Sequence, residues 1–147
     1  MRVLLSLLLF ASITLVVGLR DVAADTPPAF IVIVNAENRN VALDRELVAD
    51  AFLKKTTRWP NGDVIKPVDL PGSSPVRERF SDAVLKRSVA AVKSYWQQMI
   101  FSGRDVPPIE VATDDEVIKF VGAHTGAIGY VSGTAHLGDT KAVTVRP

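Results

Sequence analysis

The feature that most constrains the fold is an alternation of strand-type and helix-type segments along residues 29–145. Residues 29–34 read AFIVIV, and a continuous apolar run of this kind is typical of a strand buried on both faces, as at the centre of a parallel sheet. Further strands are expected at residues 64–70, 127–131 and 142–145. This alternation favours an α/β layer sandwich, in which helices cover the sheet.

Helices are expected between these strands, and each has a recognisable first residue. Asp44 can accept hydrogen bonds from the free N–H groups at the start of the first helix. Pro75 suits the first position of the second helix, and Ser88 suits the N-cap of the third. Thr113 and Glu116 have the spacing of a capping box, which predicts that a fourth helix begins there.

The N-terminal segment has the pattern of a secretory signal. Arg2 precedes an apolar run from residue 3 to residue 18, and Ala23 and Ala24 suit a signal peptidase. The run is shorter than the about 20 residues that span a bilayer. We therefore predict a signal peptide over residues 1–24 and a single mature domain over residues 25–147, with no membrane insertion after cleavage.

Charge and cysteine content exclude several classes of function. The chain carries 17 basic and 16 acidic residues, and removal of the leader leaves the mature chain formally neutral. A neutral chain lacks the basic footprint of a nucleic-acid-binding or membrane-surface protein. Because there is no cysteine, there is no disulfide, no thiol nucleophile and no site for lipid attachment at the mature N-terminus.

Catalytic and metal-binding motifs are not found. The only histidines are His124 and His136, and His124 has no carboxylate at metal-ligand spacing. No serine lies in a G-x-S-x-G elbow. Tyr95 and Trp96 fall on the apolar stripe of the third helix and are expected in the core, whereas Trp59, beside a turn, is left open between core and ligand stacking. We expect no enzyme activity, no metal and no cofactor.

Three segments together resemble a known family. Residues 52–59 read FLKKTTRW, residues 72–80 read GSSPVRERF, and residues 126–131 read GAIGYV. In this order they are similar to the "FLGK-TxW", Gly-Ser-Gly-Thr and "GAIGYV" segments of the phosphate-type periplasmic substrate-binding proteins of ABC transporters. The resemblance implies a three-layer α/β sandwich like one lobe of a type 2 periplasmic binding protein, located in the periplasm.

Two departures from that family affect what the resemblance implies. A full family member has two lobes that close on the ligand, whereas residues 25–147 have the length of one lobe. In the anion loop, Pro75 replaces a threonine and offers neither N–H nor hydroxyl. Asp69 stands where phosphate binders tend to carry arginine, and its carboxylate would repel an oxyanion.

The candidate ligand-binding residues are Gly72, Ser73, Ser74 and Arg77, which place hydroxyls, backbone N–H groups and a guanidinium at a helix N-terminus. In the alternative interpretation Ser74 only caps the helix that Pro75 begins, and Arg77 is solvated. If the site is genuine, replacing Arg77 and Ser73 by alanine should abolish oxyanion binding and leave the thermal melt nearly unchanged.

The sequence therefore predicts an exported, non-catalytic solute-binding-like domain that binds phosphate or another small oxyanion weakly. The alternative is a protein-interaction or sensory accessory domain that has lost small-ligand binding. Its partner would then be a membrane transporter, a sensor or a separately encoded second lobe, and a contiguous exposed apolar patch would distinguish this alternative.

Overall fold

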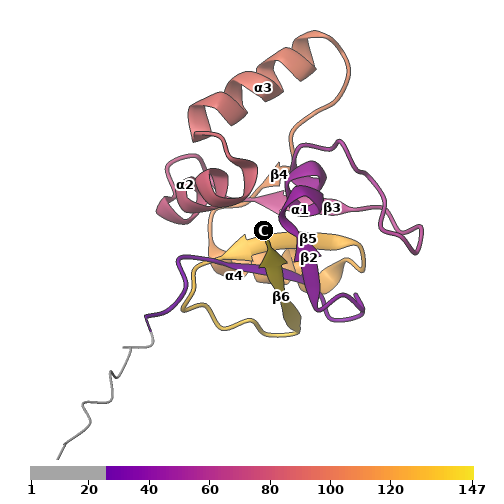
Figure 1. The fold of residues 1–147 in the computed structure, drawn as a ribbon, viewed down its shortest axis with the longest axis vertical. Coiled ribbons are helices and arrows are strands. Elements are labelled where there is room, and N and C mark those ends of the chain that lie inside the picture. The colour runs from indigo at the N-terminus through magenta and orange to yellow at the C-terminus, as the bar shows by residue number, and fades with distance from the viewer. Residues whose placement is uncertain (1–25) are drawn as a thin grey trace, which may run out of the picture.

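The computed structural model describes residues 26–147, and the predicted signal peptide lies outside the described residues. A six-stranded sheet with the order β2-β6-β1-β5-β3-β4 forms the centre of the domain (Figure 1). The strands are β1 (Ile31–Asn35), β2 (Ala42–Asp44), β3 (Lys66–Asp69), β4 (Ile109–Glu110), β5 (Ala127–Val131) and β6 (Thr140–Arg146). The helices are α1 (Arg45–Phe52), α2 (Pro75–Phe80), α3 (Val89–Phe101) and α4 (Asp114–Ala123), with a π-helical turn η1 (Ser81–Leu85) that continues α2.

Strand β1 lies inside the sheet, as its apolar run predicts, between β5 and β6. The parallel surroundings suggested for this strand are wrong, because β1 runs antiparallel to both neighbours, with Ile33 opposite Gly129 and Ala142. The pairs β3–β5, β3–β4 and β2–β6 are parallel. An apolar run reports burial on both faces, and burial does not determine the direction of the neighbouring strands.

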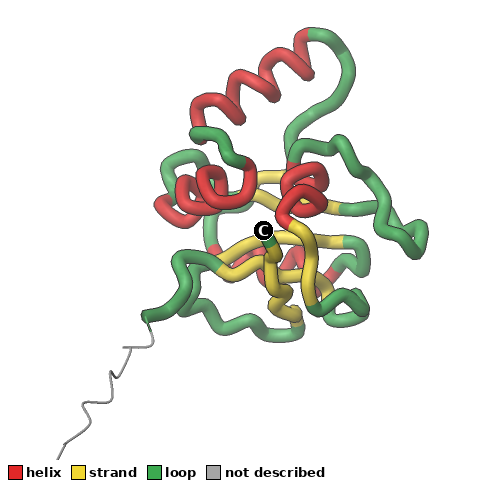
Figure 2. Tube along the Cα trace, in the orientation of Figure 1, coloured by secondary structure: helices red, strands yellow, loops and turns green. Residues whose placement is uncertain are grey.

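Helices cover both faces of the sheet, which confirms the expected three-layer sandwich (Figure 2). Adjacent residues of β5 show the two sides, because successive side chains of a strand point to opposite faces. At Gly129 the sheet packs against α4, since a Cβ there would lie 2.6 Å from Val117 Cγ1. Tyr130 faces α1 and α2, and its ring stacks on Phe80 with centroids 3.9 Å apart.

Three of the predicted helix starts are confirmed. The Ser74 and Ser88 hydroxyls accept hydrogen bonds from the backbone N–H groups three residues later, at 3.4 and 3.1 Å. Thr113 and Glu116 form the expected capping box. These starts were predictable because a cap depends only on residues within one turn.

The predicted cap hydrogen bond to the Asp44 side chain is wrong. Asp44 occupies the N-cap position of α1, but its carboxylate makes no cap hydrogen bond. It lies instead 2.8 Å from Nη2 of Arg146, because β2 and β6 pair side by side with these two residues in register. The sequence analysis did not predict β2 or β4, which are only three and two residues long.

Trp59 is part of the core. Its side chain is buried, and its indole N–H donates a hydrogen bond of 3.0 Å to the carbonyl of Gly126. The same carbonyl accepts the backbone N–H of Lys66 at 3.0 Å. Trp59 therefore holds the start of β5 against β3, which decides for the core interpretation.

Helix α3 projects beyond the sheet, which Figure 1 shows clearly. Val92 and Trp96 anchor the helix by burial, and the Tyr95 hydroxyl donates to the Leu53 carbonyl at 2.8 Å. The residues of its C-terminal end are largely exposed. Within residues 26–147, no helix combines the length and the apolar character that a membrane span requires.

We predict that Gly126→Ala will destabilise the domain by about 2 kcal/mol or more, because overpacking against fixed backbone is costly. A Cβ at this position would lie 1.9 Å from the Val64 carbonyl oxygen. The matched control is Gly122→Ala, where the nearest atom is 4.0 Å away and α4 is still helical. Urea unfolding should show the control unchanged or more stable by up to about 1 kcal/mol; equal effects of the two substitutions would contradict the packing described at Gly126.

Candidate functional site

The candidate site lies at the end of the sheet where β3 finishes and the chain turns through residues 70–74 into α2. Because β3, β4 and β5 are parallel, their carboxyl ends all lie at this end of the sheet. In open α/β sheets, ligands bind outside the carboxyl ends of the strands. The topology therefore places the predicted anion loop at the carboxyl ends of the strands, where a ligand is expected.

A buried ion pair lies at the centre of the site. Asp69 Oδ2 contacts Arg77 Nη1, and the two side chains are only 9% and 8% exposed. The guanidinium also donates to the Leu70 carbonyl at 2.9 Å and to the Ser81 hydroxyl at 3.3 Å. Arg77 is therefore buried and is held by the protein through Nη1 and Nε, so the interpretation in which it is solvated is wrong.

The other oxygen of Asp69 is also satisfied. The Tyr130 hydroxyl and the Leu70 N–H both donate to Oδ1, the second at 3.0 Å. Burial raises the pKa of Asp69 above its ordinary value, and the Arg77 charge and the Tyr130 hydrogen bond offset this only in part. Burial and the Asp69 charge raise the pKa of Tyr130, which keeps the phenol protonated as a donor.

The remaining candidate residues form the rim of the site. Gly72 and Ser73 are exposed, and Ser74 is half-buried. Ser74 is occupied by structural hydrogen bonds, since its N–H donates to the Pro71 carbonyl at 2.9 Å and its hydroxyl caps α2. Within residues 26–147 the Ser73 hydroxyl has no such partner. The structure thus places three candidates in the loop before α2 and the fourth, Arg77, in the first turn of α2, with its charge directed to Asp69.

A pocket of about 440 Å³ opens beside this loop. Its walls come from the loop, from α3 and from the segment before β4, and they are mainly apolar. The lining residues are Asp69, Gly72, Arg77, Val89, Lys93, Trp96, Gln97, Ile100, Pro107, Pro108 and Glu110. The sequence analysis missed the contribution of α3 and β4. The signal that could have found it is the apolar stripe of α3, which continues to the end of that helix.

A second, polar pocket of about 640 Å³ lies at the opposite ends of these strands, between residues 37–40 and residues 59–63. These loops precede β3 or follow β1, so they lie at the amino ends of the parallel strands. This position makes it the weaker candidate. In the described part of the chain, no group of three or more histidine or acidic side chains is arranged to hold a metal ion.

The sheet order, the helices on both faces and the loop at the carboxyl edge define an α/β domain like one lobe of a periplasmic binding protein. Comparison with solved structures finds the same fold in phosphate-binding proteins of ABC transporters. An ABC-type phosphate transport receptor from Vibrio cholerae matches with a TM-score of 0.60 and 20% identity, over 78% of this chain and 45% of its own.

Two further structures agree. A protein from Clostridium perfringens, described as a phosphate ABC transporter substrate-binding protein and solved with phosphate, gives a TM-score of 0.63 at 20% identity over 80% of this chain. PstS from Borrelia burgdorferi gives 0.60 at 15% identity over 80%. The chain spans 44% and 47% of their respective lengths. No protein-family model matches the sequence, and no curated protein matches it.

The burial of Arg77 corrects one expectation. The double replacement of Arg77 and Ser73 by alanine was expected to leave the thermal melt nearly unchanged, which requires that Arg77 be exposed. The guanidinium is instead the counter-charge of a buried carboxylate. Removing it leaves Asp69 uncompensated, so this substitution would test stability and ligand binding together.

We predict strong coupling between Asp69 and Arg77. Asp69→Asn and Arg77→Met should each lower the free energy of unfolding by about 3–5 kcal/mol, because each leaves a buried charge or donor without its partner. The double variant should lose less than the sum of the two. The exposed pair Asp50–Lys55, at 3.9 Å, is the control: Asp50→Asn should cost under about 1 kcal/mol. Additive effects at Asp69 and Arg77 in urea unfolding would show that the two charges do not depend on each other.

Proposed function

We propose that residues 25–147 form an exported, non-catalytic, solute-binding-like domain that binds small oxyanions only weakly. The observation that carries this proposal is the Asp69–Arg77 pair. The carboxylate of Asp69 contacts the guanidinium where an incoming oxyanion would need it. The domain therefore carries an internal substitute for the anionic ligand.

Charge and exposure both support weak binding. With Arg77 neutralised by Asp69, an oxyanion at the loop is attracted by the polar groups of Gly72 and Ser73 and by the dipoles of the first turn of α2. The cation of Lys93 in the adjoining pocket is opposed by the anion of Glu110 there. These groups lie on an exposed rim. A ligand held from one side keeps much of its surface in water, and high affinity normally requires that most of that surface be buried.

The compartment and the absence of chemistry are part of the proposal. The signal pattern of residues 1–24 supports export, and the periplasm is chosen because the resembled family acts there and because the chain has no cysteine for lipid attachment. The buried groups of the site satisfy one another and leave no nucleophile beside a free base. A membrane transporter or sensor is the class of partner that this function requires.

We predict that freeing Arg77 will strengthen oxyanion binding. In thermal melts of the purified protein with phosphate or sulfate, the original sequence should shift only at millimolar concentrations. Asp69→Asn should start less stable and gain more, because an oxyanion can replace the lost carboxylate. Ligand at about 100 times its Kd stabilises by about 2.7 kcal/mol, which a melt of this domain resolves.

The control is the Asp69→Asn/Arg77→Met variant, which should lose the additional response to oxyanions. Potassium chloride at matched ionic strength separates specific binding from screening. Micromolar phosphate binding by the original sequence would overturn the weak-binding proposal. An Asp69→Asn variant that responds no more than the original would show that Asp69 does not compete with the oxyanion.

A role in protein interaction is the second candidate, and a separate observation favours it. Four of the large apolar side chains that are exposed on the described residues lie between residues 100 and 109. A concentration of this kind marks a docking surface more often than a solute site.

A further inference from the structure

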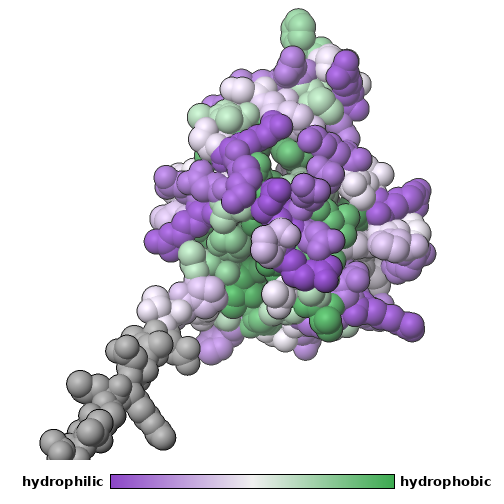
Figure 3. All heavy atoms as spheres, viewed as in Figure 1, coloured by the Kyte–Doolittle hydropathy of each residue, from purple (hydrophilic) through white to green (hydrophobic). Residues whose placement is uncertain are grey.

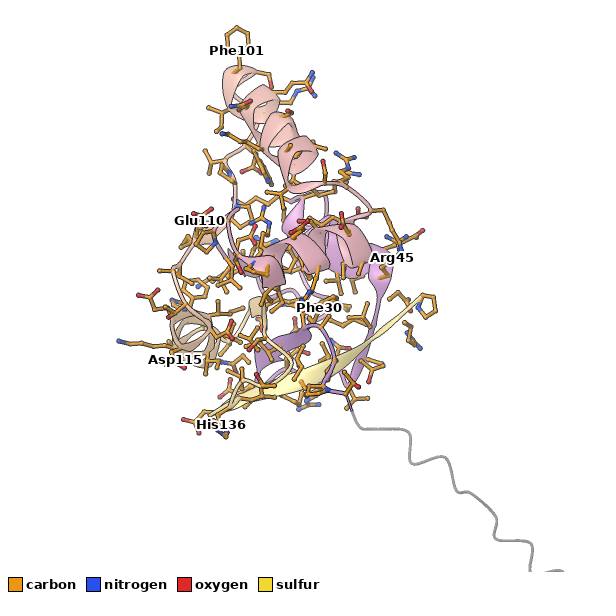
Figure 4. The ribbon with its side chains drawn as sticks, turned by 90° about the vertical axis from the view of Figure 1, so that its left-hand side faces the viewer. Phe30, Arg45, Phe101, Glu110, Asp115 and His136 are labelled. Carbon is orange, nitrogen blue, oxygen red and sulfur yellow. The ribbon has the colours of Figure 1, made fainter. Side chains whose placement is uncertain are left out.

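The exposed apolar side chains lie on one continuous stretch of chain. Phe101, at the end of α3, is 95% exposed, and Figure 4 shows it at the far tip of the molecule. Ile100, Val106 and Ile109 are 52%, 58% and 58% exposed. We call these four residues the α3–β4 surface. Elsewhere on the described residues, only Val41 and Val64 are comparably exposed.

This surface arises because the apolar stripe of α3 extends further than the body that covers it. Val92 and Trp96 are buried against the domain, whereas Ile100, one turn beyond Trp96, is half exposed. In Figure 3 a small pale green, apolar group forms the tip of the molecule, next to purple, hydrophilic residues. An apolar helix face is stable in water when another apolar surface covers it.

The pocket beside the α3–β4 surface is itself partly apolar, so it offers a surface that can cover the α3–β4 surface of another molecule. It is lined on its apolar side by Val89, Trp96, Pro107 and Pro108, and Ile100 belongs to both the pocket and the surface. A volume of about 440 Å³ accommodates an aromatic side chain. Exposed aromatic residues that enter a partner's pocket commonly act as the anchors of an interface.

The charges at the rim indicate what kind of partner fits. Lys93 and Glu110 both line the pocket, both are exposed, and neither has an ion-pair partner within residues 26–147. A two-fold interface presents one patch to a copy of itself, so that residue i meets residue j and j meets i. A patch with one cation and one anion is therefore complementary to itself, whereas a patch of one sign would repel its copy.

We propose that the α3–β4 surface is a self-association interface, and that its occupant is a second copy of this chain. Phe101 of each copy lies in the pocket of the other, and Lys93 of each copy faces Glu110 of the other. The inference goes beyond the proposed oxyanion site and does not depend on it.

The experiment is sedimentation velocity of the purified mature domain, residues 25–147, over a wide range of protein concentration. The weight-average mass should rise from monomer to dimer with concentration. Phe101→Ser should raise the dimer Kd by about thirtyfold or more, the effect expected for a central aromatic anchor. Val41→Ser is the matched control, because Val41 is 74% exposed beside β2, at the other edge of the sheet, and should leave the Kd unchanged.

The charged pair gives an independent test of the two-fold arrangement. Lys93→Glu and Glu110→Lys should each weaken the dimer several-fold, and the Lys93→Glu/Glu110→Lys double variant should restore it, because the swap recreates opposite charges across the interface. Thermal melts confirm that each variant folds. A monomer at every concentration would overturn the second copy as occupant, and a dimer insensitive to Phe101 or without charge-swap recovery would overturn the location of the interface.

Discussion

The buried pair of Asp69 and Arg77 is the interaction on which the rest of the site depends. Asp69 ends β3, Arg77 lies in the first turn of α2, and Tyr130 brings β5 into the same network while stacking on Phe80. The pair thus holds the end of β3 against the start of α2, and this fixes the position of the loop between them. Two charges removed from water require this complete set of donors, because a partly satisfied network would cost more than an apolar core.

Features that depend on neighbours in sequence were predictable, and features that depend on tertiary contacts were not. The caps at Ser74, Ser88 and Thr113 and the burial of β1 are local properties, and the structure confirms them. From the sequence, Asp69 is expected to repel an oxyanion and Arg77 to attract one. Each judgement is sound for an isolated residue. Their mutual neutralisation depends on how the loop turns back, which no spacing rule determines.

The same distinction applies to α3. Its periodicity correctly predicted an apolar stripe and the burial of Trp96, but periodicity treats every turn of the helix alike. Whether a given turn is covered depends on how far the sheet and the neighbouring helices extend. Here η1 and the end of α1 reach the first turns, so Val92 is buried while Ile100, on the same stripe, is 52% exposed. An exposed residue on a predicted core stripe is therefore more informative than an isolated exposed residue.

The Asp69–Arg77 pair affects both the loop of residues 70–74 and the pocket beside the α3–β4 surface. Covering a pocket that contains a free guanidinium would remove an unpaired charge from water, which costs several kcal/mol. In this domain the Arg77 charge is already paired and hydrogen-bonded beneath the pocket wall. A second apolar surface can then cover the pocket and displace water mainly from apolar walls. The Asp69 carboxylate that weakens attraction for a free oxyanion thus also lowers the cost of a protein interface at the same place.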